Sequence, residues 1–248
     1  MMAAPATVQT RRLSTGVFTD AELDYFDSLG PDYFPSEETP KVGETTWHYL
    51  SIKLAFNLLE RVFPEPSDVF IAANHFLYWD PRQRGQVIGA DLYVVKGVGR
   101  KNRSSYKVWE EGGRVPDVVF EFASEETWRK DRADKKRLYE QDLRIPEYFL
   151  FDPIGRFLPH QLEGFRLEAG VYQPIEPANG RLHSEQLGLE LLAEGMYLRF
   201  FDPTTGALVP TPEEVEMARR EAEAKATKAE AENVRLRAEL EALRSRLA

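Results

Sequence analysis

The sequence predicts an α/β fold, with helices flanking a mixed β-sheet and a separate helix at the C-terminus. Two observations predict the sheet and its helices: apolar, β-branched and aromatic runs of strand length, and runs with apolar residues at helical spacing. The third is the character of residues 211–248, where no proline or glycine follows Pro212. We therefore expect a flexible N-terminus over residues 1–18, one globular domain over 19–210 and a helical appendage over 211–248.

The first half of the chain begins with helices and continues with strands. Capping residues and apolar spacing predict a short helix from Thr19 and a longer helix over residues 45–62. Apolar runs predict strands over residues 68–79 and 87–95, and the second of these carries Asp91 at its centre. An acid in the middle of an otherwise apolar strand is the first candidate for a functional residue.

The central stretch carries a second mid-strand acid. Residues 117–123 form an apolar run in which Glu121 is costly to bury unless a cation or hydrogen-bond donors meet it. Ser124 is a good N-cap for a helix that we expect to continue to about Asp142. On that helix Lys135 lies on the same stripe as the apolar residues that face the sheet, so it is expected to reach Glu121. The alternative is a purely structural glutamate–lysine pair.

Later segments extend the sheet. Residues 147–151 are expected to form a buried strand, ended by Asp152-Pro153. Alternating patterns around residues 165–172, and again over 196–200, predict further strands that close the sheet. Helix, strands, helix and strand in this order are typical of a layered α/β domain.

Two neighbouring strands with an acid each, followed by an inward lysine, suggest metal-assisted chemistry. Two carboxylates can hold a hard divalent cation such as Mg²⁺, with water and a substrate phosphate as further ligands. A lysine can orient the attacking water or help to deprotonate it. The four histidines are widely spaced, so a zinc site is not expected. His48 is interpreted as a structural histidine, and Glu44 is a candidate for a supplementary acid.

Several motifs resemble those of one protein family. They are Pro116–Ser124, then Asp131, Lys135 and Tyr139, and finally Ile145–Pro153. Together they are similar to the Uma2 family of endonuclease-like proteins in the PD-(D/E)XK superfamily, over roughly residues 20–205. The resemblance implies a restriction-endonuclease-like fold and a histidine near position 48 beside the site.

The resemblance also implies roles for individual residues. Asp91 and Glu121 would bind the metal with their carboxylates, and Phe122 would bind it with its main-chain carbonyl. Two positions after Glu121, where many relatives have the catalytic lysine, this chain has Ala123, so that role falls to Lys135 on the following helix. Asp117 follows a proline, as the first acid usually does, but it lies about 13 Å along the strand from Glu121. Asp91, which lacks that proline, is the better candidate.

These features predict a Mg²⁺-dependent endonuclease acting on DNA, with Mn²⁺ as a possible substitute. The alternatives are a nuclease-fold module that binds nucleic acid or protein partners without cutting, and a purely structural dimer. The net charge of −9 opposes tight nonspecific DNA binding. Basic residues do gather over 96–107 and 129–137, either as a phosphate-binding surface or as a solvated face. The absence of cysteines, of a membrane-length apolar run and of a signal-peptide core predicts a cytoplasmic protein.

The C-terminal helix carries a heptad pattern. Small and apolar residues recur at four-three spacing from Val215 to Leu247, broken at Arg219. Asn233 falls at an a position, where a polar residue sets the register of a parallel pair. We therefore expect a coiled coil that joins a homodimer. A single solvated helix is the alternative, because the seam is weak where its residues are alanines.

Overall fold

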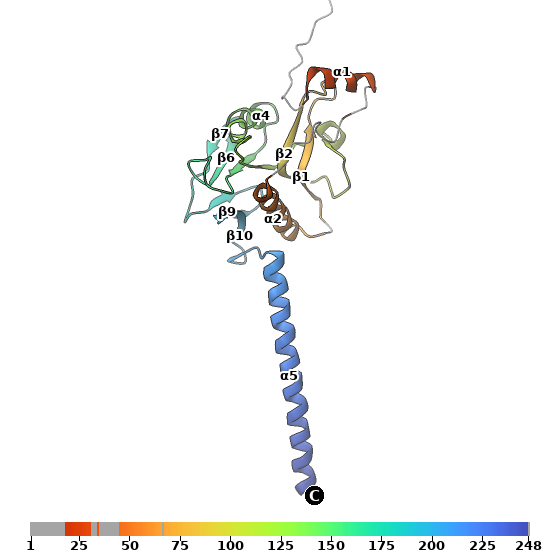
Figure 1. Cartoon of the computed structure of the whole chain (residues 1–248), viewed down its shortest axis with the longest axis vertical. Coiled ribbons are helices and arrows are strands. Elements are labelled where there is room, and N and C mark those ends of the chain that lie inside the picture. Colours follow the sequence, from red (N-terminus) through yellow and green to blue (C-terminus); the bar gives the residue numbers. More distant parts are fainter. Residues whose placement is uncertain (1–17, 31–33, 35–44, 66, 248) are drawn as a thin grey trace, which may run out of the picture. The chain divides into compact units, whose positions relative to one another are not determined.

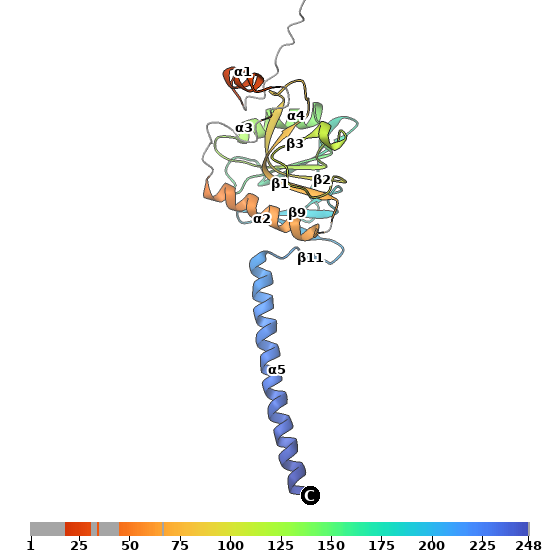
Figure 2. The same ribbon diagram turned by 90° about the vertical axis from the view of Figure 1, so that its right-hand side faces the viewer.

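The computed structural model describes residues 18–30, 34, 45–65 and 67–247 (Figures 1 and 2). The chain divides into two compact units, Met1–Val209 and Pro210–Ala248. Glu44 and most of the segment 1–18 lie outside the described residues. Phe18 is described and is buried, and its ring lies 5.7 Å from that of Phe76.

The first unit is built on a mixed seven-stranded sheet, which confirms the predicted α/β class. Its strand order is β3-β1-β2-β4-β5-β6-β7. Strands β4 and β5 are parallel, as are β1 and β3, and the other neighbours are antiparallel. The strands are β1 (Val69–Tyr78), β2 (Val87–Lys96), β3 (Tyr106–Lys107), β4 (Val118–Phe122), β5 (Glu147–Phe151), β6 (Leu162–Glu168) and β7 (Val171–Pro174).

A second sheet of four strands corrects the prediction for residues 196–200. These residues do not close the main sheet but lie in a separate one of order β11-β10-β9-β8. Its strands are β8 (Leu182–Ser184), β9 (Leu189–Glu194), β10 (Tyr197–Asp202) and β11 (Ala207–Leu208). The physical reason is local: a tight turn at Gly195, with φ of +61°, pairs β9 with β10 directly.

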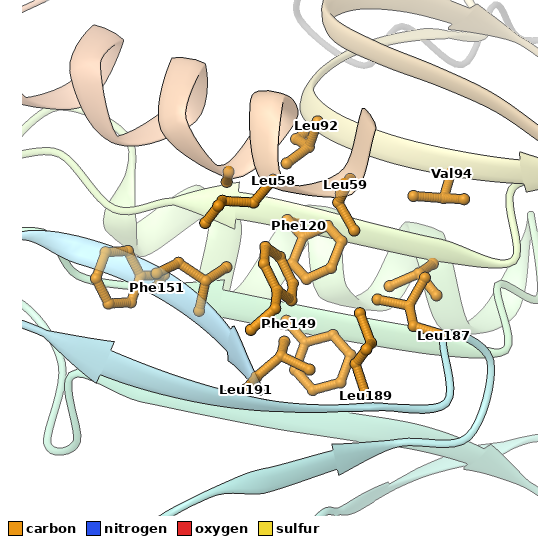
Figure 3. Close-up of a cluster of buried hydrophobic side chains, with 14 of the residues drawn as sticks. Leu58, Leu59, Leu92, Val94, Phe120, Phe149, Phe151, Leu187, Leu189 and Leu191 are labelled. Carbon is orange, nitrogen blue, oxygen red and sulfur yellow. The ribbon is translucent and has the colours of Figure 1, made fainter. Parts of the chain in front are cut away.

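Helices cover both faces of the main sheet. On one face α2 (Thr46–Val62) and the second sheet enclose an apolar core that includes the stacked rings of Phe120 and Phe149 (Figure 3). On the other face α4 (Lys136–Gln141) packs Tyr139 against residues of β4 and β5. This unit also contains α1 (Asp20–Ser28), a 3₁₀ turn η1 (Val108–Glu111) and α3 (Trp128–Lys130). No helix among the described residues is long and apolar enough to cross a membrane.

The helix predicted to continue from Ser124 to Asp142 is shorter and interrupted. Helix α3 begins at Trp128, after a turn in which Ser124 Oγ accepts a hydrogen bond from the Thr127 N–H at 3.2 Å. A π-helical turn, η2 (Asp131–Lys135), separates α3 from α4. Such turns insert an extra residue into a helix and are frequent at functional sites.

The second unit is the helix α5 (Pro212–Leu247). It begins with a capping box in which Thr211 Oγ1 accepts from the Glu214 N–H and Glu214 Oε2 accepts from the Thr211 N–H. Of the heptad leucines, Leu236 and Leu240 are 44% and 56% exposed. The side chains of Leu243 and Leu247 lie outside the described part of the chain.

A first prediction concerns stability and the buried acid at the start of β5. Glu147 is fully buried and accepts hydrogen bonds from Arg166, from the Ser184 hydroxyl and from the main-chain N–H groups of Glu185 and Gln186. Glu147→Ala leaves these donors unmet, so we expect it to lower the free energy of unfolding by about 3–5 kcal/mol in urea denaturation. Glu185→Ala is the matched control, because Glu185 is the exposed carboxylate on the same arginine. A similar loss in both variants would contradict the argument.

Candidate functional site

The two predicted acids stand on neighbouring strands. Strands β2 and β4 pair antiparallel with Leu92 opposite Phe120, and the continuation of this register puts Asp91 opposite Glu121. Asp91 Oδ2 also accepts a hydrogen bond from the main-chain N–H of Phe122 at 2.7 Å. Asp91 is therefore tied to the segment of β4 that carries the second acid.

The alternation of side chains along β2 breaks at Asp91. Leu92 packs into the core on the α2 face of the sheet, whereas Ala90, two positions before it, packs into the core on the opposite face. Regular alternation would place both on one face. In the adjoining strand β1, the residue opposite Asp91 in register is Asn74, which has a φ of +48°. The side chains of β2 therefore change faces at Asp91, so that groups on both faces of the sheet can reach the Asp91 carboxylate.

Glu121 is met by donors from the π-helical turn and the helix after it. Lys135 Nζ lies 2.8 Å from Glu121 Oε2, and the Tyr139 hydroxyl donates to Glu121 Oε1 at 2.5 Å. Lys135 also lies 3.1 Å from Asp131 Oδ1 and donates to the main-chain oxygen of Gly89 at 3.3 Å. Glu121 and Asp131 are both fully buried, so one ammonium group serves two buried acids.

His48 approaches the same place from α2, on the other face of the sheet. Its Nε2 lies 2.8 Å from the main-chain oxygen of Phe122 and 3.4 Å from Asp91 Oδ2. His48 Nε2 therefore contacts both oxygens. Phe122 donates its N–H to Asp91 and presents its carbonyl to His48, which Asp91 Oδ2 also contacts.

Burial and charge shift the pKa values of the acids in different directions. Burial raises the pKa of Glu121 well above its usual range, and the carboxylates of Asp91 and Asp131 add to the rise. Burial also raises the pKa of Asp131, against the effect of Lys135. For Asp91 burial acts in the same direction, but His48, Lys135 and the Phe122 N–H together lower its pKa below the ordinary value.

Lys135 is held in its charged form. Burial alone would lower its pKa, but the carboxylates of Glu121, Asp131 and Asp91 together raise it well above the ordinary value. A lysine in this state donates hydrogen bonds and supplies positive charge. It does not accept a proton at neutral pH.

Three residues beyond the predicted site residues make contacts at the site. His48 contacts Asp91 and Phe122, Asp131 contacts Lys135, and Tyr139 donates to Glu121. The spacing of Asp131 and Lys135, four residues apart on a helix, could have indicated their pairing. His48 lies more than 40 residues away from its partners in the sequence, so only the family resemblance placed a histidine near this position beside the site.

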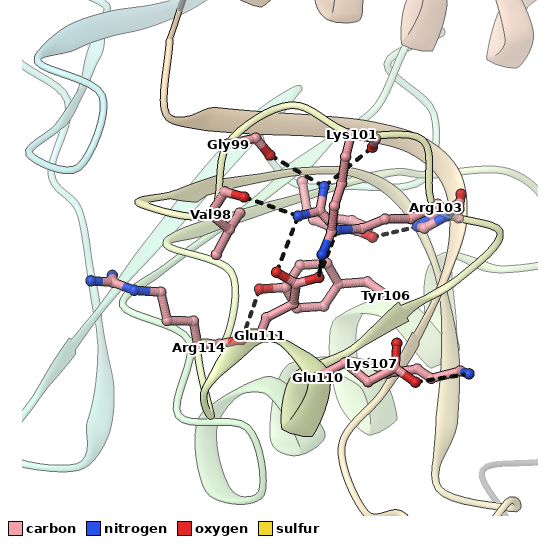
Figure 4. Close-up of polar contacts among 11 residues, drawn as sticks. Val98, Gly99, Lys101, Arg103, Tyr106, Lys107, Glu110, Glu111 and Arg114 are labelled. Carbon is pink, nitrogen blue, oxygen red and sulfur yellow. Dashed lines mark hydrogen bonds and ion pairs between the residues drawn. The ribbon is translucent and has the colours of Figure 1, made fainter. Parts of the chain in front are cut away.

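The basic residues from Lys96 to Lys107 are paired with acids of the same chain. Each of these five basic residues lies within 4 Å of an acid of this chain, as Figure 4 shows for the cluster around Glu111. Lys101 and Arg103 both lie 2.9 Å from Glu111, and Arg100 lies 2.8 Å from Glu60. The guanidinium of Arg103 also stacks over Phe70. A phosphate bound here would have to compete with these acids.

The donor set is one that fits a hard divalent cation. A carboxylate oxygen of Asp91 and the carbonyl oxygen of Phe122 both contact His48 Nε2, and Glu121 stands opposite Asp91 in the strand register. Oxygen ligands of this kind, one or two carboxylates with water completing the shell, are what Mg²⁺ prefers. Among the described residues, no group of three or more His, Cys, Asp or Glu side chains is arranged to hold a metal. A site here would therefore depend on the main-chain carbonyl and on water.

The chain was compared with known proteins. The Uma2 family, described as "Putative restriction endonuclease", matches residues 37–198, well over half of the chain. Among solved structures, a "putative nuclease belonging to DUF820" from Anabaena variabilis matches with a TM-score of 0.43 and 12% identity. That match covers 62% of this chain and 81% of the other. No curated protein matches the sequence.

Proposed function

The chain belongs to the Uma2 family, and from that premise we propose that it is a metal-dependent endonuclease that hydrolyses phosphodiester bonds in DNA. The observation that carries this proposal is the grouping of oxygen atoms at the end of β4. There the oxygens of Asp91 and Phe122 both contact His48 Nε2, and Lys135 contacts the neighbouring Glu121. Nuclease chemistry needs these same groups: oxygen ligands for a cation and a positive side chain beside them.

In this proposal Asp91, Glu121 and the carbonyl of Phe122 hold Mg²⁺, or Mn²⁺ in its place. When bound, the cation supplies positive charge that stabilises the phosphate oxygens and lowers the pKa of a water molecule. Lys135 donates hydrogen bonds from its ammonium group to the attacking water and to phosphate oxygens. Because its pKa is raised, it orients the water and balances developing negative charge, and the proton of the water is released to bulk solvent.

The buried surroundings hold Lys135 in place. Asp131, from the preceding turn of the helix, and Tyr139, from the following turn, contact Lys135 and Glu121 respectively. With such contacts a catalytic side chain needs little reorganisation when substrate arrives. Asp131 is therefore a positioning residue for Lys135.

The second candidate is a nuclease-fold module that binds nucleic acid or a protein partner without cutting it. It is favoured by the contacts that the acids already make, since His48 lies beside Asp91 and Lys135 beside Glu121. A cation would have to compete with both groups. If these contacts prevail, the protein binds no metal at physiological concentrations.

The experiment that separates the two candidates is metal binding measured beside cleavage. Full-length protein is expected to nick supercoiled plasmid in Mg²⁺ or Mn²⁺ and not in EDTA. Calorimetry should show Asp91→Asn weakening the affinity for Mn²⁺ by more than about 100-fold, because even the loss of an outer-shell partner costs about 10- to 100-fold. Asp117→Asn is the matched control, since Asp117 follows the proline and accepts from the Lys96 N–H away from the site.

One outcome would contradict the endonuclease, and another would contradict the assignment of its metal ligand. Wild-type protein that binds no divalent cation, yet binds nucleic acid, would favour the module that does not cut. Loss of Mn²⁺ binding in Asp117→Asn with retention in Asp91→Asn would move the metal site to the other acid.

A further inference from the structure

An open groove runs between α2 and β1, outside the residues that the proposed chemistry uses. It has a volume of about 320 Å³ and is lined by Tyr49, Ile52, Lys53, Phe56, Ala73 and Asn74. This volume lies at the small end of the roughly 300–1,000 Å³ typical of small-molecule sites. The groove is therefore suited to one flat ring system with its attached groups.

The groove adjoins the candidate site at both of its walls. On the α2 wall, Ile52 lies one helical turn after His48, which contacts Asp91 and Phe122. On the β1 wall, Asn74 lies between Ala73 and His75, whose partners on β2 are Leu92 and Ala90. Asn74 and Asp91 are thus opposite in register, and opposite Cα atoms in such a pair lie about 5 Å apart. A molecule in the groove would lie next to the proposed metal ligands.

The lining combines an apolar floor with polar walls. Ile52, Phe56 and Ala73 are apolar, and the Tyr49 ring remains 49% exposed at the rim. Lys53 and Asn74 are exposed, and the Lys53 ammonium lies 5.8 Å from the centre of the Tyr49 ring. A ring for stacking, an amide for a polar ring edge and an ammonium for a phosphate are the groups that recognise a nucleotide.

The backbone conformation of Asn74 also indicates a ligand site. A φ of +48° is uncommon for a residue other than glycine, although asparagine tolerates it better than most. Conformations of this kind concentrate at ligand sites, where the surrounding structure enforces them. Here the unusual residue lies in the middle of a strand, exposed, and lines the groove.

We propose that this groove binds the unstacked base of a nucleotide next to the scissile phosphate, with Tyr49 as its stacking partner. The inference rests on the proposed nuclease function and adds the form of its substrate. A base inside a duplex is stacked and paired, so only a single-stranded or flipped-out nucleotide can enter a groove of this size. Single-stranded nucleic acid is therefore the preferred substrate over intact duplex.

The direct test is photocrosslinking of full-length protein, without added metal, to a single-stranded oligonucleotide that carries 5-iodouracil. Mass spectrometry is expected to locate the crosslink on Tyr49. In parallel, the affinity of each variant for the same oligonucleotide is measured by fluorescence anisotropy. Tyr49→Leu should weaken binding about 5- to 150-fold, the range that corresponds to roughly 1–3 kcal/mol of stacking per base.

The matched control is Tyr25→Leu, which removes another exposed tyrosine, on α1. It should leave affinity unchanged. Lys53→Gln is a second variant, expected to weaken binding and to reduce its dependence on salt, as the loss of one phosphate contact does. Thermal unfolding of all variants should match the wild type, because these side chains are largely exposed.

The outcomes distinguish failure of the base-binding proposal from failure of the proposed nuclease function. If Tyr49→Leu cleaves at the wild-type rate with metal and keeps its affinity for single strands, base binding in the groove is contradicted and the nuclease function is not. Binding of single strands that depends on Tyr49, in a protein that never cleaves, would support base binding in the groove and contradict the nuclease function. A change in oligomeric state caused by Tyr49→Leu in the absence of nucleic acid would assign this face to a second copy of the chain and overturn the inference.

Discussion

Replacing Lys135 with methionine is expected to lower metal-dependent cleavage of DNA by about 10²- to 10³-fold, the range for loss of one hydrogen-bond donor that stabilises developing charge. The reason is that the ammonium of Lys135, 2.8 Å from Glu121, is the cationic group that we assign to the attacking water. The affinity for Mn²⁺ should not fall, because Lys135 is not a ligand and competes for the charge of Glu121. Single-turnover cleavage and calorimetry on the same preparations measure the two effects.

Methionine is chosen over alanine because the site is buried. It keeps most of the volume of the lysine, so a loss of cleavage is not caused by a cavity. Lys136→Met is the matched control, since the neighbouring ammonium lies over the ring of Phe165, away from the acids. Cleavage by Lys135→Met at the rate of Lys136→Met would show that the proposed role is wrong. Equal cleavage by Glu121→Gln and wild type would show that the activity is contamination or lies elsewhere.

Removal of the C-terminal helix is expected to convert a homodimer into a monomer. We propose that α5 pairs in parallel with a second copy through its heptad positions, and that the leucines at its far end hold the pair. Each leucine contributes about 1.5–3 kcal/mol when fully buried, whereas the alanine section adds little. Asn233 disfavours trimers and shifted registers. Light scattering on full-length protein and on a chain ending at Pro210 measures the change.

Point substitutions on α5 give a sharper version of the same test. Leu236 and Leu240 are heptad positions, and a glutamate at either one would bury a charge in the seam. Val234 is 63% exposed and lies outside the seam, so Val234→Glu is the matched control. We expect Leu240→Glu to be monomeric at micromolar concentration and Val234→Glu to remain dimeric. Monomeric wild-type protein would contradict the coiled coil, and a dimeric truncated chain would place the interface elsewhere.

Much of the fold could be predicted from local patterns. The apolar run around Glu121 indicated a strand buried on both faces, and β4 is buried along its whole length. Helix α2 begins at Thr46, within the predicted range, because its apolar spacing and the residues that begin a helix lie close together in the sequence. The second sheet could not be predicted in this way, since a strand's pattern does not reveal which sheet it joins.

The candidate site could likewise be predicted from the sequence only in part. The sequence by itself indicated Asp91 and Glu121, because an acid inside an apolar strand stands out without knowledge of its neighbours. Only the tertiary structure brought His48 to Asp91 and Phe122, and only it showed Arg100 paired with Glu60, which is 40 residues away. A pattern of period two or 3.6 reports which side of one element is buried. Contacts between side chains depend on how whole elements pack, and here the position of α2 across the sheet decided them.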